Sequence, residues 1–383
     1  MTVQTSSDTT LSEKLLKRAA PSRAEYEDLV VVPIFAFIVA LIIGALVMLA
    51  TAVDPVTIGR SYIALLKGSV GSLNAVSETL TAAAPLILAG LGLSLGFRAG
   101  LFNIGAEGQI IVGGLVAAIV GFSIEGLPWA LHLPLTLLAG AFAGAAYASI
   151  AGWLRAATGA HEVISTIMLN LISYRLLDYM LRLPWVQKAG RADPISKSVL
   201  ESAELPRLLA WIDANLRVHA GLFLVIAAVV LIYWLLFRTK LGFEFRASGE
   251  NSDAARYAGI RAPLIIVTAM GSAGALAGLA GANQVLGVLG RATPGFSAGI
   301  GFDAISVALL GRSHPVGVLF AGLLFGALKA GGRQMQVDAG VSIDLIGIIQ
   351  ALIIVFIAAP LLVRAIFPWG FRKSTTDQKD SAS

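Results

Sequence analysis

Residues 263–290 read PLIIVTAMGSAGALAGLAGANQVLGVLG, a run of 28 residues without a charged side chain. At about 1.5 Å of rise per residue, a helix of this length exceeds the ~30 Å hydrocarbon core of a membrane. The run therefore predicts a membrane-spanning helix. Comparable uncharged runs occur at residues 30–52, 79–97, 108–124, 126–154, 220–237 and 345–360.

Two further segments are less uniform. Residues 161–183 include Glu162, Arg175 and Asp178, yet their apolar residues recur at helical spacing. Residues 302–329 are interrupted by the sequence GRSHP at 311–315, which predicts a short helix, a turn and a second helix. The prediction is an all-α, polytopic membrane protein of about ten transmembrane helices with short or interrupted segments.

The composition agrees with this class. Charged residues make up 13% of the 383 residues and hydrophobic residues 57%, whereas soluble domains carry about 25% charged residues. The 28 Lys and Arg are scattered along the chain, so no basic cluster suggests nucleic-acid binding. Cysteine is absent and the four histidines are far apart, so neither a thiolate site nor a metal site is predicted.

The chain is expected to have one membrane domain between two polar tails. Residues 1–29 and 366–383 are predicted to be cytoplasmic tails, and residues 30–365 form the membrane domain. The positive-inside rule gives this orientation weak support. Three small-residue motifs in the predicted spans, at residues 140–144, 274–278 and 322–326, have the form Gly-x-x-x-Gly. Such motifs allow two helix backbones to approach closely, so we assign them to packing.

Polar residues inside the predicted spans mark a candidate translocation path. Asn103 and Glu107 lie in a glycine-rich segment, residues 98–109, that joins two spans almost without a loop. A carboxylate at membrane depth costs about 2.5–3.5 kcal/mol on insertion scales, and it normally faces a partner or water. Glu107 either lines a path, or caps the N-terminus of the helix that it opens, or pairs with Arg98. Asn283 and Asp303 are weaker candidates, and a cap is the commonest role for a residue placed as Asp303 is.

A third polar stretch, residues 245–260, predicts a very short helix. Asn251 or Ser252 is placed to cap it, Asp253 falls in its first turn and Gly259 is placed to end it. A helix of six to eight residues is marginal alone in water, so it is expected to dock on something. A plain surface loop is the alternative.

The sequence contains no catalytic constellation. It has no Gly-x-Ser-x-Gly, no zinc-binding pattern and no GxxxxGK[ST] motif, so the chain is not itself a P-loop ATPase. We expect a transport subunit rather than an enzyme, with no cofactor in this chain.

Three stretches together resemble a known family. Residues 96–114, HEVISTIMLN at 161–170 and GENSDAARYAGI at 249–260 are similar to the nucleoside-type permease subunits of bacterial ABC importers. These belong to a broad family that includes ribose, simple-sugar and branched-chain amino-acid permeases. The resemblance covers roughly residues 30–365.

The resemblance implies a role, partners and site residues. The chain would form the solute path of an importer in a bacterial cell membrane. The expected solute is a nucleoside. Its partners would be an ABC ATPase that uses ATP, a sister permease and an extracytoplasmic substrate-binding lipoprotein. The loop at about 239–262 would hold the helix that couples to the ATPase, through Glu250, Asn251, Asp253 and Arg256. An importer for simple sugars is the alternative, and an ion-coupled secondary transporter using Glu107 or Asp303 also remains open.

Overall fold

The structure is a computed structural model that describes residues 32–358. Over this range the chain is helical, with α-helices α3 to α15 and no β-strand. It divides into two compact units, each described by itself. One holds α3 (Val32–Ala50) and most of α15 (Ile343–Ala358), and the other is Pro55–Ile346. The predicted tails, residues 1–29 and 366–383, lie outside the described residues.

Six of the described helices are long and apolar enough to cross a membrane. Two shorter apolar helices, Ile38–Ala50 and Ile300–Leu310, accompany them. The all-α class is therefore confirmed, whereas the predicted number of about ten transmembrane helices is not. The six are α5 (Leu73–Arg98), α6 (Ala106–Ser123), α7 (Trp129–Thr158), α9 (Gly221–Arg238), α12 with its extension (Ala262–Leu289) and α14 (Pro315–Ala339).

One helix, α4 (Pro55–Val70), was not anticipated from the sequence. It contains Arg60 and Lys67, so a search for uncharged runs passes over it. Its buried residues Ile58, Ser61 and Leu65 nevertheless recur every three or four positions and face α14 and α5. Helical periodicity, rather than charge, was the signal that identifies this helix.

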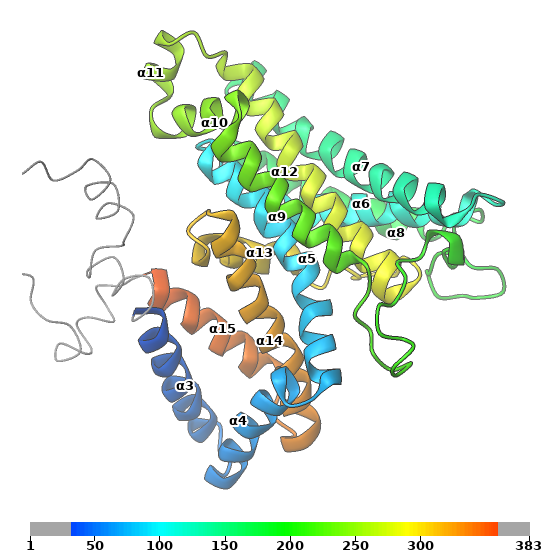
Figure 1. The fold of residues 1–383 in the computed structure, drawn as a ribbon, viewed down its shortest axis with the longest axis vertical. Helices are drawn as coiled ribbons and strands as arrows, with labels where there is room; N and C mark the ends of the chain where they lie inside the picture. Colours follow the sequence, from blue (N-terminus) through cyan, green and yellow to red (C-terminus); the bar gives the residue numbers. More distant parts are fainter. Residues whose placement is uncertain (1–31, 359–383) are drawn as a thin grey trace, which may run out of the picture. The chain divides into compact units, whose positions relative to one another are not determined.

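Helix α5 is the centre of the Pro55–Ile346 unit. All residues from Ala83 to Gly96 are buried, because α12, α14 and α13 (Ile300–Leu310) pack around it. A helix that is apolar on every side suits such a position. Helix α12 also runs alongside α7, as Figure 1 shows, and packs on α6.

The two ends of α12 carry different structures. At its start lie two short helices, α10 (Lys240–Glu250) and α11 (Ser252–Tyr257), at one end of the bundle (Figure 1). At its far end lies the mostly irregular segment 184–220. That segment is bonded to helix ends: the Leu200 N–H donates to Gly121 O at 3.0 Å and the Leu205 N–H to Leu286 O at 3.0 Å. It therefore covers the end of the bundle opposite α10 and α11.

The three Gly-x-x-x-Gly motifs all lie at helix contacts, as predicted. Gly144 of α7 meets Gly278 of α12, where a Cβ on Gly278 would be 3.1 Å from Gly144 Cα. Gly326 of α14 meets α5, where a Cβ would be 2.6 Å from Thr79 O. In each contact the neighbour is backbone, which cannot move aside as a flexible side chain does. The motifs thus fix the spacing of α7 against α12 and of α14 against α5.

We predict that Gly278→Val destabilises the protein strongly. Overpacking typically costs about 1–3 kcal/mol, and contact with backbone places this change at the upper end of that range. Gly59→Val is the matched control, since a Cβ at Gly59 meets nothing within 4 Å. The measurement is the thermal unfolding midpoint in detergent. Equal midpoints for the two variants would contradict the packing assignment.

Candidate functional site

Residues 98–109, from the last residue of α5 to the first turn of α6, form a compact segment that we call the link. Gly100 adopts a left-handed conformation, with φ +73°, which a glycine tolerates without strain. The Phe102 ring stacks on Phe97, with ring centroids 5.0 Å apart. The side chains of Asn103, Glu107 and Gln109 are each only 1% exposed. Three polar side chains are therefore buried within one short segment, and each of them needs hydrogen-bond partners.

Asn103 and Gln109 are partners of each other. The Asn103 Nδ2 donates to Gln109 Oε1 at 3.1 Å, and the Gln109 Nε2 donates to Asn103 Oδ1 at 3.1 Å. Asn103 Oδ1 also accepts from the Gly105 N–H at 2.8 Å. This closed arrangement holds the turn that precedes α6. Asn103 was predicted to line the path. In the structure its amide is hydrogen-bonded to Gly105 and Gln109 of the same segment.

Helix α8 (Glu162–Met180) braces the link from one side. The Asn170 Oδ1 accepts from the Gly108 N–H at 2.8 Å, and its Nδ2 donates to Ile104 O at 2.9 Å. Glu162 Oε1 accepts from the Phe102 N–H at 3.2 Å, and Glu162 also forms an ion pair with Arg155. The sequence stretch 161–170 thus meets the stretch 98–109 through its polar residues. Both stretches belong to one structural site.

Glu107 caps a helix that lies far away in the sequence. Its Oε2 accepts from the Gly301 N–H at 2.7 Å, and its Oε1 accepts from the Gly299 N–H at 3.2 Å. Tyr174 donates its hydroxyl to Oε1 at 3.3 Å. Both amides belong to the N-terminus of α13, which has free N–H groups and a partial positive charge. Glu107 therefore stabilises α13.

Pairing with Arg98, one of the alternatives that the sequence left open for Glu107, is not seen among the described contacts. The Arg98 Nε instead donates to Ser313 O at 3.0 Å, in the turn after α13. Asp303 is not the cap of α13 either, because Gly299 occupies that position. Asp303 forms an ion pair with Lys329 of α14, with 2.6 Å between Oδ2 and Nζ. Both side chains of this pair are about one-third exposed (32% and 27%), so they reach the surface of the unit.

Asn283 lies in a different part of the molecule. It is fully buried near the end of α12, and its amide has no hydrogen-bond partner in the described part of the chain. It lies against Gly221 at the start of α9, next to the imidazole of His219. The chain continues as a π-helix, Val285–Leu289, and such segments are frequent at functional sites. Burial lowers the pKa of His219 to about 4, aided by Arg217 and Arg207, so this histidine is neutral at pH 7.

The predicted coupling residues lie together on the exposed side of α10 and α11. Asn251 caps α11, and its Oδ1 accepts from the N–H groups of Asp253 and Ala254 at 3.1 and 2.9 Å. The predicted short helix and its cap are confirmed, and Gly259 follows with φ +84°. The side chains of Glu250, Asp253 and Arg256 are exposed, while Ala255 is buried. Tyr257, at the end of α11, is 94% exposed.

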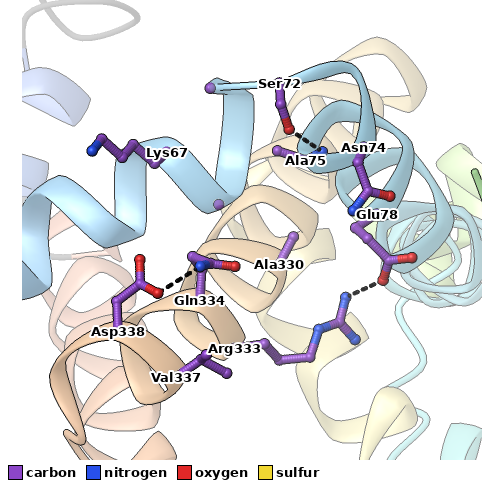
Figure 2. Close-up of a pocket in the computed structure, with 12 residues that line it drawn as sticks. Lys67, Ser72, Asn74, Ala75, Glu78, Ala330, Arg333, Gln334, Val337 and Asp338 are labelled. Carbon is purple, nitrogen blue, oxygen red and sulfur yellow. Dashed lines mark hydrogen bonds and ion pairs between the residues drawn. The ribbon is translucent and has the colours of Figure 1, made fainter. Parts of the chain in front are cut away.

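A separate pocket lies between α4, α5 and α14, with a volume of about 500 Å³ (Figure 2). Figure 2 shows Glu78 facing Arg333, whose Nη2 donates to Glu78 Oε2 at 3.0 Å. Arg217 approaches the same oxygen at 3.3 Å. None of the predicted site residues lines this pocket. Across residues 32–358, no group of three His, Asp or Glu side chains is placed to hold a metal ion.

Several residues of the site were missed from the sequence. Tyr174, Gly299, Gly301 and Lys329 give no local signal, because their partners lie far along the chain. Helix α8 did carry a signal: Glu162, Thr166, Asn170 and Ser173 are buried and fall on one helical face. A polar stripe on an otherwise apolar helix indicates a face that is turned towards protein rather than lipid.

We predict that Glu107→Gln lowers the stability of the protein by about 1.5–3 kcal/mol, the usual contribution of hydrogen bonds to a charged group. The glutamine keeps the size of the side chain but loses its negative charge beside two amide donors. Glu125→Gln is the control, because Glu125 is exposed between α6 and α7. The unfolding midpoint in detergent is the measurement, and similar midpoints for both variants would refute the capping role.

Residues 75–358 match the family described as the permease component of branched-chain amino acid transport systems. Among the curated relatives, the guanosine ABC transporter permease protein NupP of Bacillus subtilis (strain 168) is 39% identical over 334 residues, or 87% of this chain and 94% of the relative. The glucose ABC transporter permease protein TsgB13 of Haloferax volcanii is 39% identical over 332 residues, or 85% of this chain and 86% of the relative.

A third relative, the nucleoside ABC transporter permease protein NupB of Lactococcus lactis subsp. cremoris (strain MG1363), is 35% identical over 343 residues, or 88% of this chain and 93% of the relative. Bacillus subtilis and Lactococcus lactis each hold a second, less similar relative, NupQ and NupC. No solved structure matches the chain. The family match covers most of the chain and the relatives are aligned over most of their own length. The chain therefore belongs to the branched-chain amino acid transport permease family and is a membrane-spanning ABC transporter permease subunit, not an enzyme.

Proposed function

We propose that this permease forms the solute path of an ATP-driven importer for nucleosides. The similarity to a guanosine permease and a nucleoside permease, over more than four-fifths of each chain, is the observation that supports this solute. The chain has no P-loop motif, so ATP is bound and hydrolysed by a separate ATPase. A simple sugar is the alternative solute, because a glucose permease is equally similar at 39% identity.

The ATPase would bind at the α10–α11 end of the bundle. Glu250, Asp253 and Arg256 offer both signs of charge on an exposed surface, and Asn251 holds the helix that presents them. A helix of six residues is marginal on its own, and Ala255 anchors this one to the rest of the protein. These features support α11 as the coupling helix. Tyr257 adds an exposed aromatic ring beside the charges.

The orientation follows from that assignment. The α10–α11 end would face the cytoplasm of a bacterial cell, as would both chain termini. The segment 184–220 would then lie outside, where an extracytoplasmic substrate-binding lipoprotein delivers the solute. Ten transmembrane helices would bring the chain back to the cytoplasm.

A second, sister permease would complete the path. Two relatives support a heterodimer, because NupP and NupB each have a less similar companion from the same organism, NupQ and NupC. Of the four predicted path residues, Asp303 with Lys329 reaches the surface of the unit and is the best placed to face the solute. Asn103 and Glu107 would not contact the solute; their hydrogen bonds would hold the link and α13 in position. Asn283 would contribute a buried amide near the outer end of α12.

We predict that cells lacking this subunit lose high-affinity uptake of radiolabelled nucleosides, guanosine among them, and keep uptake of amino acids. Restoring the wild-type gene should restore nucleoside uptake, which serves as the control. Unchanged nucleoside uptake with loss of glucose or ribose uptake would reject the nucleoside assignment. The permease assignment would stand in that case.

We also predict that Arg256→Glu leaves the protein folded in the membrane but weakens its association with the ATPase. Truncating one partner of a buried interface charge pair costs about 2–5 kcal/mol, and 2 kcal/mol corresponds to roughly thirtyfold weaker binding. Co-purification of the ATPase and solute uptake are measured in the same membranes. Arg60→Glu is the control, since Arg60 is also exposed but lies on α4.

The outcomes separate clearly. Normal association and normal uptake in Arg256→Glu would remove this residue from the ATPase interface. A wild-type protein that binds no ATPase would overturn the proposed importer mechanism itself.

A further inference from the structure

Helix α13 lies between two stretches of left-handed backbone. Ala298 and Gly299 precede it with φ 46° and 75°, and Arg312 and Ser313 follow it with φ 52° and 51°. Residues other than glycine rarely adopt this conformation, and they keep it only where the surrounding structure holds them. Helix α13 is therefore a short helix with a strained connection at each end. Hinges are formed by a few loop or helix-terminal residues, and both connections of α13 lie at such positions.

The link at residues 98–109 holds both ends of this helix. Near its end, Glu107 bonds the N–H groups of Gly299 and Gly301 at the start of α13. At its beginning, Arg98 bonds Ser313 O in the turn after α13. The carboxylate lies at the positive end of the helix dipole and the guanidinium at the negative end. One segment of twelve residues thus contacts α13 at both of its strained connections.

The same link touches the end of α10. Gly100 and Gly249 pack backbone to backbone: a Cβ on Gly100 would be 3.1 Å from Gly249 Cα, and one on Gly249 would be 2.9 Å from Gly100 N. A cavity of about 370 Å³ adjoins this contact and is lined by residues of the link and by Ser248, Glu250 and Asn251. The end of α10 and the link are therefore in direct backbone contact, with no side chain between them.

Hydrogen bonds hold the link along its length. Asn170 fixes Ile104 and Gly108, Glu162 fixes Phe102, and the Asn103–Gln109 pair closes the turn between them. A displacement at Gly100 would therefore have to break these hydrogen bonds to be absorbed within the link. If they hold, the displacement would reach Arg98 and Glu107, which are bonded to the two ends of α13.

We propose that residues 98–109 couple the α10–α11 corner to α13, so that movement at the ATPase-facing end changes the position of α13 and of its Asp303–Lys329 pair. This inference rests on the proposed binding of an ATPase at α10–α11. Arg98 and Glu107 act as positioning residues, since they hold α13 rather than the solute. Gly100 and Gly249 form the contact through which the movement enters the link.

The test uses the complete transporter with its ATPase and binding protein. Gly249→Ala inserts a methyl group against the backbone of Arg98 and Gly100 without altering Glu250, Asp253 or Arg256. Gly59→Ala is the matched control, because a Cβ at Gly59 meets nothing within 4 Å. We expect the Gly249→Ala protein still to co-purify with the ATPase. Solute-stimulated ATP hydrolysis and solute uptake should each fall at least tenfold. Wild-type stimulation and uptake in Gly249→Ala would overturn the coupling role.

A second variant and a direct readout keep the proposal testable if Gly249→Ala folds poorly. Arg98→Gln removes the guanidinium that donates a hydrogen bond to Ser313 O. It leaves the backbone contact between Gly100 and Gly249 intact. The chain has no cysteine, so Phe302→Cys on α13, whose native side chain is 45% exposed, is the single labelling site. Its labelling rate should change on ATP addition, and Arg98→Gln should abolish that change.

An ATP-dependent labelling change that persists in Arg98→Gln would refute the proposal. Failure of the wild-type protein to bind an ATPase would instead refute the proposed function, so the two failures are distinguishable.

Discussion

The carboxylate of Glu107 is buried, with the residue only 1% exposed, among helices that are apolar enough to span a membrane. A buried charge requires hydrogen bonds from its surroundings, and here the donors are two backbone amides of α13 and the Tyr174 hydroxyl. This requirement determines the positions of three elements. Helix α6 must start where its first turn reaches α13, α13 must present its N-terminus, and α8 must approach from the side. The amides of Asn103 and Asn170 satisfy the backbone of the link in the same way, because irregular backbone at membrane depth must be bonded within the protein.

Much of the fold was predictable from the sequence because the membrane imposes a simple rule. Uncharged runs such as residues 79–97 and 263–290 correspond to α5 and to α12 with its π-helical extension. The break at residues 311–315 separates α13 from α14 as expected. Helix α4 escaped prediction because Arg60 and Lys67 interrupt its apolar residues. The segment 184–220 escaped because its structure depends on bonds to the ends of α6 and α12 and not on its own sequence.

The candidate site was only partly predictable, for a physical reason. The Asn251 cap of α11 is local, with a donor three residues away, and the sequence was sufficient to narrow the cap to Asn251 or Ser252. The partners of Glu107 lie 192 and 194 residues away, and no neighbouring residue reveals them. Asp303 was recognised as a polar residue at a helix start, but its partner Lys329 comes from the next helix. Sequence patterns reveal that a buried charge needs a partner, whereas only the fold reveals which partner it has.

The long separation between Glu107 and α13 has a consequence for how the protein is made. At about 5–20 residues per second, synthesis of the roughly 190 intervening residues takes on the order of 10–40 s. During this interval α6 exists without the Gly299 and Gly301 amides, and its carboxylate carries an insertion cost of about 2.5–3.5 kcal/mol if it enters lipid alone. Tyr174, 67 residues after Glu107, is the earlier of its donors to be synthesised. The hydrogen bonds that bury Glu107 are therefore completed only when α13 docks, after Gly299 and Gly301 have been synthesised.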